Sequence, residues 1–327
     1  MLNLVHGLKS RGVQAELFTA GNGKLFRLAE AEGLVPKPAC RETIEGMAPG
    51  LIHAHDSGAL TIALRSARKH KTPVVLSRRI ASPLRRNPFS RAKYSAGRIA
   101  AVVAISQTVK RVFAESGYPV DRIHVVPSGL DLEALDAVTA DPDLRQRYRC
   151  RYLAVGIGSL TKKKNWQMLI RTAARLADEG MDIDWLLAGE GPEQGRLEKL
   201  ARRCGIQDRV HLLGFREDVQ QILKSCDLLF FPSLIEGASV TVREAMALGT
   251  PVVAVNAEGT AESLEGHGRL VDPDNVDGAA RTVRDLLENP AARASLADAA
   301  RESARNRFSF VRTITGTMAV YESVLPA

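Results

Sequence analysis

Short runs of β-branched and other apolar residues alternate with stretches of helical periodicity along the whole chain. This alternation is typical of βαβ units, in which helices connect the strands of a parallel sheet. In the first half, strands are predicted at Val13–Thr19, Leu51–Asp56, Pro73–Arg78, Ala100–Ser106 and Ile123–Ser128. In the second half, they are predicted at Tyr152–Gly158, Asp184–Gly189, Val210–Gly214, Leu228–Pro232, Val252–Asn256 and Gly268–Val271.

Helices are expected between these strands, notably at Trp166–Glu179, Glu193–Cys204, Val240–Leu248 and Val276–Glu288. The charged, weakly apolar segment Asp131–Arg149 contains Pro142 and is predicted to connect two domains. We therefore expect an α/β domain over residues 1–135, a linker over residues 136–150 and a second α/β domain over residues 151–309. An amphipathic helix over residues 310–327 is expected to pack back toward the first domain.

Composition supports two intracellular α/β domains. The chain has 327 residues, of which 45% are hydrophobic and 5% aromatic, which is enough for two cores covered by helices. Its four cysteines have no paired spacing, which argues against a disulfide framework or a zinc site and favours a reducing cytoplasm. No apolar run approaches the roughly 18 residues that a membrane-spanning helix needs.

The net charge of +8 is concentrated in the first half of the chain. Residues 1–135 contain 20 Lys and Arg against 10 Asp and Glu, and residues 57–114 contain 13 basic residues and no acidic one. Such a surface attracts anionic partners, which include phosphorylated lipids and lipid headgroups, so peripheral membrane contact is a candidate. A merely solvated basic surface is the open alternative. Nucleic acid is disfavoured, because no aromatic residues are interleaved as stacking platforms.

The most informative segment for chemistry is Phe230–Ala254. A buried strand is predicted to end at Pro232, and a loop of small residues then leads into a helix that Ser239 can cap. Unpaired amides at the start of that helix can bind a phosphate group. Glu236 and Glu244 flank this site, and since a carboxylate repels phosphate, we expect them to bind hydroxyl groups. An ordinary capped helix with a surface glutamate is the simpler alternative.

Three further clusters carry weaker signals. Lys162–Lys164 lies at a predicted helix start, where cations are unfavourable, and this favours an anionic ligand over a solvated surface. His55 or Asp56 is expected to face a ligand, because both follow a strand at the carboxyl edge of its sheet; capping or burial is the alternative. Gly189 and Gly191 do not complete a dinucleotide fingerprint, since the next glycine is Gly195 and Pro192 intervenes.

The segment from Glu236 to Glu244 resembles the E-x7-E motif of glycosyltransferase family 4, a retaining family with the GT-B fold. The resemblance extends over nearly the whole chain and implies an α/β, GT-B architecture of two Rossmann-like domains facing across a cleft. It includes four other motifs: HAHD at His53–Asp56, VVPSGLD at Val125–Asp131, GSLTKKKN at Gly158–Asn165 and LLAGEG at Leu186–Gly191.

The resemblance implies roles for these residues. Glu236 would hold the transferred sugar and Lys164 would neutralise the leaving diphosphate, so these two are the catalytic candidates. Glu244 would bind the ribose of a nucleotide diphosphate sugar, which is a substrate, and neither a metal nor another cofactor is expected. The other donor-binding candidates are Gly158, Lys162, Phe215, Arg216, Gly237, Ala238 and Ser239. The acceptor-side candidates are His55, Asp56, Arg78 and Arg79.

The sequence departs from the family pattern in three places. Members usually open with a strand and a glycine-rich loop, whereas Met1–Gly12 resembles the helix that follows them. The first domain is therefore expected to lack its first strand, which would leave the neighbouring strands with unpaired edges. Ser159 replaces a phosphate-binding arginine, for which Lys162 or Lys163 could substitute. Arg78 replaces a histidine, and since arginine cannot act as a base, it would bind an anionic group.

The predicted function is transfer of a sugar to a lipid-linked or cell-envelope glycan, such as lipopolysaccharide, by a cytoplasmic enzyme at the inner face of the membrane. The main alternative is a catalytically impaired GT-B partner subunit or truncated homologue. An epimerase or phosphorylase would share the fold, although the loop around Glu236 argues weakly against both. A nicotinamide oxidoreductase is disfavoured by the incomplete glycine pattern.

Overall fold

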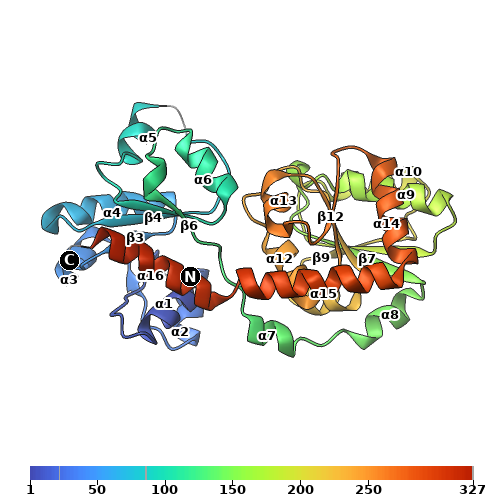
Figure 1. Cartoon of the computed structure of the whole chain (residues 1–327), viewed down its shortest axis with the longest axis horizontal. Coiled ribbons are helices and arrows are strands. Elements are labelled where there is room, and N and C mark those ends of the chain that lie inside the picture. The colour runs from blue at the N-terminus through green and yellow to red at the C-terminus, as the bar shows by residue number, and fades with distance from the viewer. Residues whose placement is uncertain (22, 85–86, 326–327) are drawn as a thin grey trace. The chain divides into compact units, whose positions relative to one another are not determined.

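The protein is described by a computed structural model that covers residues 1–21, 23–84 and 87–325 (Figure 1). The chain forms two compact units. Unit 1 comprises Met1–Gly129 and Phe308–Ala327, and unit 2 comprises Leu130–Arg307. All strand pairings among the described residues are parallel, which confirms the predicted α/β class.

The strands of unit 1 form two separate sheets. The smaller sheet pairs β1 (Phe18–Thr19) with β2 (Lys37–Pro38). The larger has the order β3-β4-β5-β6, with β3 at Ile52–Ala54, β4 at Val74–Arg78, β5 at Ala101–Ala104 and β6 at Ile123–Val125. β1 and β3 are edge strands among the described residues. β1 is shorter than the predicted Val13–Thr19, because it has a partner on one side only.

Helices cover the sheets of unit 1, and the last helix of the chain completes its core. α16 (Phe310–Val324) lies beside α1 and β5, as Figure 1 shows for α1. Val320 joins Val75, Val103 and Val126 in one buried cluster. Tyr321 Oη is 2.6 Å from His53 Nδ1 on β3, so the helix is bonded to the sheet as well as packed on it. The other helices are α1 (Leu2–Lys9), α2 (Lys24–Ala31), α3 (Arg41–Met47), α4 (Ser57–His70), α5 (Pro88–Lys93) and α6 (Gln107–Ala114).

Unit 2 contains a six-stranded sheet with the order β12-β11-β10-β7-β8-β9. The order changes direction at β7: β8 and β9 extend the sheet on one side, and β10, β11 and β12 on the other. The strands are β7 (Tyr152–Ile157), β8 (Ile183–Ala188), β9 (Val210–Gly214), β10 (Leu228–Phe231), β11 (Val252–Val255) and β12 (Arg269–Val271). The position between β7 and β10 is therefore a topological switch point, where open parallel sheets bind ligands at the carboxyl ends of the strands.

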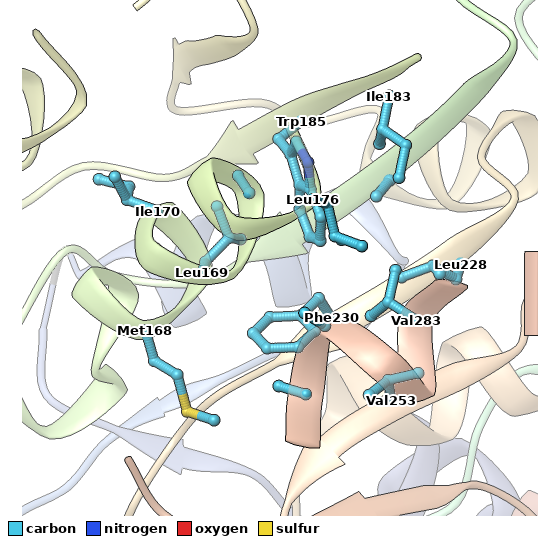
Figure 2. Close-up of a cluster of buried hydrophobic side chains, with 14 of the residues drawn as sticks. Met168, Leu169, Ile170, Leu176, Ile183, Trp185, Leu228, Phe230, Val253 and Val283 are labelled. Carbon is cyan, nitrogen blue, oxygen red and sulfur yellow. The ribbon is translucent and has the colours of Figure 1, made fainter. Parts of the chain in front are cut away.

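The sheet of unit 2 is buried between two layers of helices. α9, α10 and α14 pack on one face, where Trp185 and Phe230 meet edge to face with centroids 5.7 Å apart (Figure 2). α11 and α12 pack against strands of the sheet, and α13 and α15 lie against α12. The helices are α9 (Trp166–Asp178), α10 (Gln194–Arg203), α11 (Val219–Ser225), α12 (Val240–Leu248), α13 (Glu258–Leu264), α14 (Val276–Glu288) and α15 (Pro290–Arg307).

The segment predicted as a linker is helical over much of its length. α7 (Leu132–Ala137) and α8 (Pro142–Tyr148) occupy it, and both belong to unit 2. Aspartates cap both helices: Asp131 Oδ1 accepts from Ala134 N at 3.0 Å. Leu135 and Leu144 are buried, which explains why these short, charged helices pack against the domain instead of bridging solvent. Residues 136–150 are thus part of unit 2.

Candidate active site

Two loops at the carboxyl edge of the sheet in unit 2 meet at the switch point. The first follows β7 and includes a 3-10 turn over Lys162–Lys164; the second follows β10 and leads into α12. Leu234 N donates to Lys163 O at 3.0 Å, so the two loops are joined through their backbones. Asn165 ends the turn with φ of 53° and starts α9. The bond between Leu234 and Lys163 thus joins segments about 70 residues apart into one local structure.

The two catalytic candidates contact each other directly. Lys164 Nζ lies 2.5 Å from Glu236 Oε1, and their side chains are 16% and 13% exposed. Ser233 Oγ donates to the same carboxylate oxygen at 2.7 Å, and the ammonium also lies 4.9 Å from the centre of the Phe231 ring. Glu236 Oε2 accepts no hydrogen bond among the described residues, so it is available to a ligand hydroxyl.

The loop that carries Glu236 is fixed by close backbone packing. A Cβ atom on Gly259, in α13, would lie 2.3 Å from Glu236 O, so this approach requires a glycine. Ser239 caps α12 as predicted, because its Oγ accepts from Val242 N at 3.3 Å. The amides of Ala238 and Ser239 donate to no backbone carbonyl among the described residues. They and the helix start form a positively polarised edge beside Lys164.

Glu244 lies further along α12 and is held by a residue that the sequence did not single out. Gln220 Nε2 on α11 donates to Glu244 Oε1 at 3.0 Å. Desolvation raises the pKa of the Glu244 carboxyl, although the hydrogen bond from Gln220 and the positive charge of the nearby Arg243 lower it. A carboxyl group whose burial disfavours its ionisation is a feature of ligand sites, since structural packing alone would favour an apolar residue at such a position.

The ends of β7 and β8 are closely packed and carry two glycines. Gly158 has φ of 151° and follows β7; Gly189 has φ of 145° and follows β8. A Cβ atom on Gly189 would lie 2.0 Å from Gly158 O, and one on Gly158 would lie 3.6 Å from Lys164 Cε. The two glycines therefore let neighbouring strand ends approach each other beneath the lysine.

Phe215 and Arg216 follow β9 at the same edge of the sheet. The Phe215 ring is 64% exposed, and its N–H donates to Glu190 Oε1 at 3.3 Å. The guanidinium of Arg216 pairs with Asp218 through two bonds of 2.7 and 2.5 Å, so its side chain is already engaged. Lys162 is exposed and has no acidic partner among the described residues. Of the donor-side candidates, Lys164 and Glu236 therefore form the closest pair.

The acceptor-side candidates lie together at the carboxyl edge of the larger sheet in unit 1. His55 stacks on His53 with centroids 4.1 Å apart, and Arg79 Nη2 is 3.4 Å from His55 Nδ1. Arg78 donates to Ser82 O at 2.5 Å. Burial lowers the pKa of His55 to about 3, so its imidazole is neutral beside the Arg79 guanidinium. Burial also lowers the pKa of Arg78 and of Arg79. Asp56 differs from the others, because Ala59 N donates to its Oδ1 at 2.8 Å and it thereby caps α4.

Nothing in the described part of the chain indicates a membrane-spanning helix or a metal cluster. No helix in residues 1–21, 23–84 and 87–325 is long and apolar enough to cross a bilayer. Over the same residues, no group of three or more His, Cys, Asp or Glu side chains is arranged to hold a metal ion.

Comparison with known proteins identifies the family. A model described as Glycosyltransferase Family 4 matches residues 1–134, and one described as Glycosyl transferases group 1 matches residues 145–303. The chain belongs to this glycosyltransferase family. The two matches fall on the two halves that the sequence analysis separated, and they confirm the resemblance to a glycosyltransferase family.

Curated relatives in this glycosyltransferase family carry several activities. The chain is 28% identical over 246 residues to 2-deoxystreptamine glucosyltransferase of Streptomyces kanamyceticus, which covers 71% of the chain and 63% of that protein. It is 32% identical over 210 residues to MMP alpha-(1->4)-mannosyltransferase of Mycolicibacterium hassiacum, covering 63% and 49%. It is 30% identical over 159 residues to the lipopolysaccharide core biosynthesis glycosyltransferase LpsE of Rhizobium meliloti, covering 48% and 46%. The chain thus spans about half to three-fifths of the length of these relatives.

Solved structures of glycosyltransferases show the fold. HepE of Anabaena, crystallised with UDP and glucose, matches with a TM-score of 0.82 and 23% identity, covering 98% of this chain and 95% of that one. A glycosyltransferase of Rickettsia africae matches with a TM-score of 0.86 and 18% identity, covering 99% and 93%. The chain therefore has the GT-B fold, as the sequence predicted.

Proposed function

We propose that the chain is a retaining glycosyltransferase that moves a sugar from a nucleotide diphosphate donor to an anionic acceptor without a metal ion. The observation that carries the proposal is the pair formed by Lys164 and Glu236 at the switch point of unit 2. An ammonium group next to the amides of Ala238 and Ser239, which donate to no backbone carbonyl among the described residues, fits a diphosphate, and the adjacent carboxylate fits sugar hydroxyls. HepE, a protein of similar fold, was crystallised with UDP-glucose, which supports a uridine nucleotide as the first donor to test.

In this mechanism the protein stabilises charge that develops as the sugar leaves the diphosphate. Lys164 would stabilise the negative charge on the departing phosphate, and the amides of Ala238 and Ser239 would assist it. Glu236 would hold the sugar through its free oxygen Oε2 while Lys164 and Ser233 fix Oε1. Glu244, oriented by Gln220, would bind the ribose hydroxyls of the nucleotide. The remaining donor contacts would come from Gly158, Lys162, Gly237 and the backbone of Phe215 and Arg216.

The acceptor would be an anionic lipid-linked or cell-envelope glycan bound by unit 1. His55, Arg78 and Arg79 present two cations and a neutral imidazole at one sheet edge, and none of the three has an acidic partner among the described residues. A phosphate group matches the fork of an arginine side chain. LpsE, one of the relatives, is named for synthesis of the lipopolysaccharide core, which supports a cell-envelope glycan as acceptor. The enzyme would act on it at the inner face of the membrane.

Glu244→Gln tests the donor site most directly. Loss of a charged hydrogen bond to the ribose should weaken binding of UDP-glucose by about 1.5–3 kcal/mol, or about 10- to 150-fold, in titration calorimetry. Glu198→Gln is the matched control, because Glu198 also accepts a hydrogen bond from a glutamine, Gln194, at 3.2 Å but lies on α10. If Glu244→Gln and Glu198→Gln bind the donor like the native chain, Glu244 does not hold the ribose.

Hydrolysis separates an active transferase from an impaired partner subunit. The native chain should slowly release UDP from UDP-glucose in the absence of acceptor, and Lys164→Ala should lower that rate more than it lowers donor affinity. Donor binding without any release of UDP would instead support the partner-subunit alternative. Binding of neither UDP-glucose nor GDP-mannose would reject the proposal for the donor site.

A further inference from the structure

The side chain of Glu190 lies just beyond the end of β8, beside the loop that follows β9. Its backbone is held from the β7 side, because Leu160 N donates to Glu190 O at 2.8 Å. Glu190 is exposed, and its Oε1 accepts from the N–H of Phe215 at 3.3 Å. Over residues 1–21, 23–84 and 87–325, its Oε2 accepts no hydrogen bond and no cation pairs with it. The carboxylate is therefore oriented by the loop and open to a ligand.

The bond to Glu190 changes what the loop after β9 offers to a nucleobase. The backbone of Phe215 is among the proposed donor contacts, but its N–H already donates to Glu190. The carboxylate beside that amide can only accept hydrogen bonds. The side chain of Arg216 is engaged by Asp218 through two bonds, so it does not neutralise Glu190. A base at this edge of the sheet would therefore meet a negatively charged acceptor.

The proposed ribose contact leads to the same loop. Gln220 on α11 donates to Glu244 Oε1 at 3.0 Å, and residues 215–218 connect β9 to α11. A base attached to a ribose at Glu244 can therefore reach the loop that begins at Phe215. The Phe215 ring is 64% exposed and offers a surface on which a base can stack. Because β8 pairs with β9 as far as Ala188 and Gly214, this ring and the Glu190 carboxylate follow neighbouring strand ends.

We propose that Glu190 makes the donor site selective for guanine, so that the donor is a guanosine diphosphate sugar. Guanine alone among the common bases presents two adjacent N–H donors, N1–H and N2–H, which match the two oxygens of a carboxylate. Oε1 can accept such a bond in addition to the one from Phe215, because each carboxylate oxygen has two lone pairs. This inference rests on the proposed donor site and adds the identity of the base.

The other bases fit the carboxylate less well. The N3–H of uracil lies between two carbonyl oxygens, which a carboxylate repels. Adenine and cytosine each place a ring nitrogen that accepts hydrogen bonds beside their amino group, so they offer one donor and one repelled acceptor. Selection at Glu190 therefore combines attraction of guanine with repulsion of the alternatives.

Titration calorimetry of the full chain with nucleoside diphosphates tests the selection. GDP should bind at least about tenfold more tightly than UDP or ADP, because the bonds to a charged acceptor are made by guanine alone. Inosine diphosphate lacks only the 2-amino group and should bind about tenfold more weakly than GDP. UDP should still bind, since its ribose and diphosphate are the same, so the tests of the donor site with UDP-glucose stay valid.

The variant Glu190→Gln removes the charge and leaves an amide oxygen for the N–H of Phe215. It should weaken GDP by about tenfold and change UDP by less than about twofold. Glu193→Gln is the matched control, because it removes the same charge three residues further along, where the carboxylate pairs with Arg196 at 3.2 Å. It should keep the preference for GDP. Phe215→Leu should weaken GDP and UDP alike, by about fivefold or more, because any base can stack on the ring.

Three results would overturn the assignment of the base while leaving the donor site intact. They are binding of UDP as tight as that of GDP, equal binding of GDP and inosine diphosphate, and a preference for GDP that survives in Glu190→Gln. The comparison of GDP with inosine diphosphate uses the native chain, so it decides the question even if a variant does not fold. If no nucleotide binds, the proposed donor site is wrong and the assignment of the base fails with it.

Discussion

Removal of the Lys164 ammonium should destabilise unit 2 through the carboxylate that it leaves behind. In Lys164→Met, Glu236 keeps only the hydrogen bond from Ser233 at 2.7 Å, in a site where its side chain is 13% exposed. Truncating one member of a buried ion pair costs about 3–5 kcal/mol, and exposed pairs contribute about 0–1 kcal/mol. At this exposure we expect a loss of about 3 kcal/mol in the free energy of unfolding.

Glu236→Gln should lower the free energy of unfolding by less, about 2 kcal/mol, because the unpaired Lys164 ammonium still faces the Phe231 ring at 4.9 Å. The double variant leaves no unpaired charge, so we expect a loss of about 2–3 kcal/mol in place of the roughly 5 kcal/mol that additivity would give. The two residues would then be coupled by about 2–3 kcal/mol. Coupling of this size would identify the pair as one electrostatic unit.

Urea unfolding followed by tryptophan emission measures these quantities, since Trp166 and Trp185 both lie in the core of unit 2. The loss in Lys164→Met corresponds to a decrease in Tm of about 6–12 °C for a unit of this size. Arg196→Met is the control, because Arg196 is 62% exposed in its pair with Glu193 and should cost under about 1 kcal/mol. Additive losses within about 0.5 kcal/mol would show that the contact contributes little, and the reasoning about a buried pair would be wrong.

Two further predictions concern acid sensitivity and close packing. Burial lowers the pKa of His53 and also that of His55, the latter to about 3, so below about pH 6.5 the unfolded chain takes up protons that folded unit 1 does not. The stability of unit 1 should therefore fall from about pH 6.5 toward about pH 3, and His55→Asn should flatten that slope in a pH series of unfolding curves. Gly189→Ala should cost more than about 3 kcal/mol or prevent folding, because its Cβ would lie 2.0 Å from Gly158 O at a φ of 145°. Gly195→Ala, in helix α10 with open space around it, should stabilise the protein by about 0.5–1 kcal/mol, and thermal unfolding of both variants would expose an error if their order were reversed.

The sequence predicted the buried strands well and the short exposed ones poorly. Leu228–Phe231 lies between Asp227 and Pro232 and is fully buried, so its apolar run marks it clearly. β2 was not predicted, because Lys37–Pro38 has neither a β-branched pattern nor a buried face. The helices α7 and α8 were read as a linker, since each buries a single leucine among charged residues. Such elements depend on tertiary packing, which no local pattern records.

The members of the candidate site were predictable, but their contacts were not. The motif around Glu236 named both glutamates, and the lysine turn named Lys164. The sequence assigned the lysine to a diphosphate and the glutamate to a sugar, but it did not indicate that the two side chains contact each other at 2.5 Å across 72 positions of the chain. Gln220 and Ser233 were missed as partners because an amide or hydroxyl at a helix or strand end has no signature of its own. Only the fold brings Gln220 to Glu244.

The position of α16 has a consequence for how the protein is made. Unit 1 is discontinuous, since its first 129 residues need Phe308–Ala327 to complete it. During synthesis, Val75, Val103 and Val126 lack their packing partner Val320, and His53 lacks its hydrogen-bond partner Tyr321, until α16 has been made. Unit 2, which is continuous, can therefore reach its native state first, and unit 1 only after Phe308–Ala327 has been synthesised. The nascent chain would thus expose apolar surface of the incomplete unit 1 while unit 2 is being translated. The amino-terminal half is therefore the part that most needs chaperones.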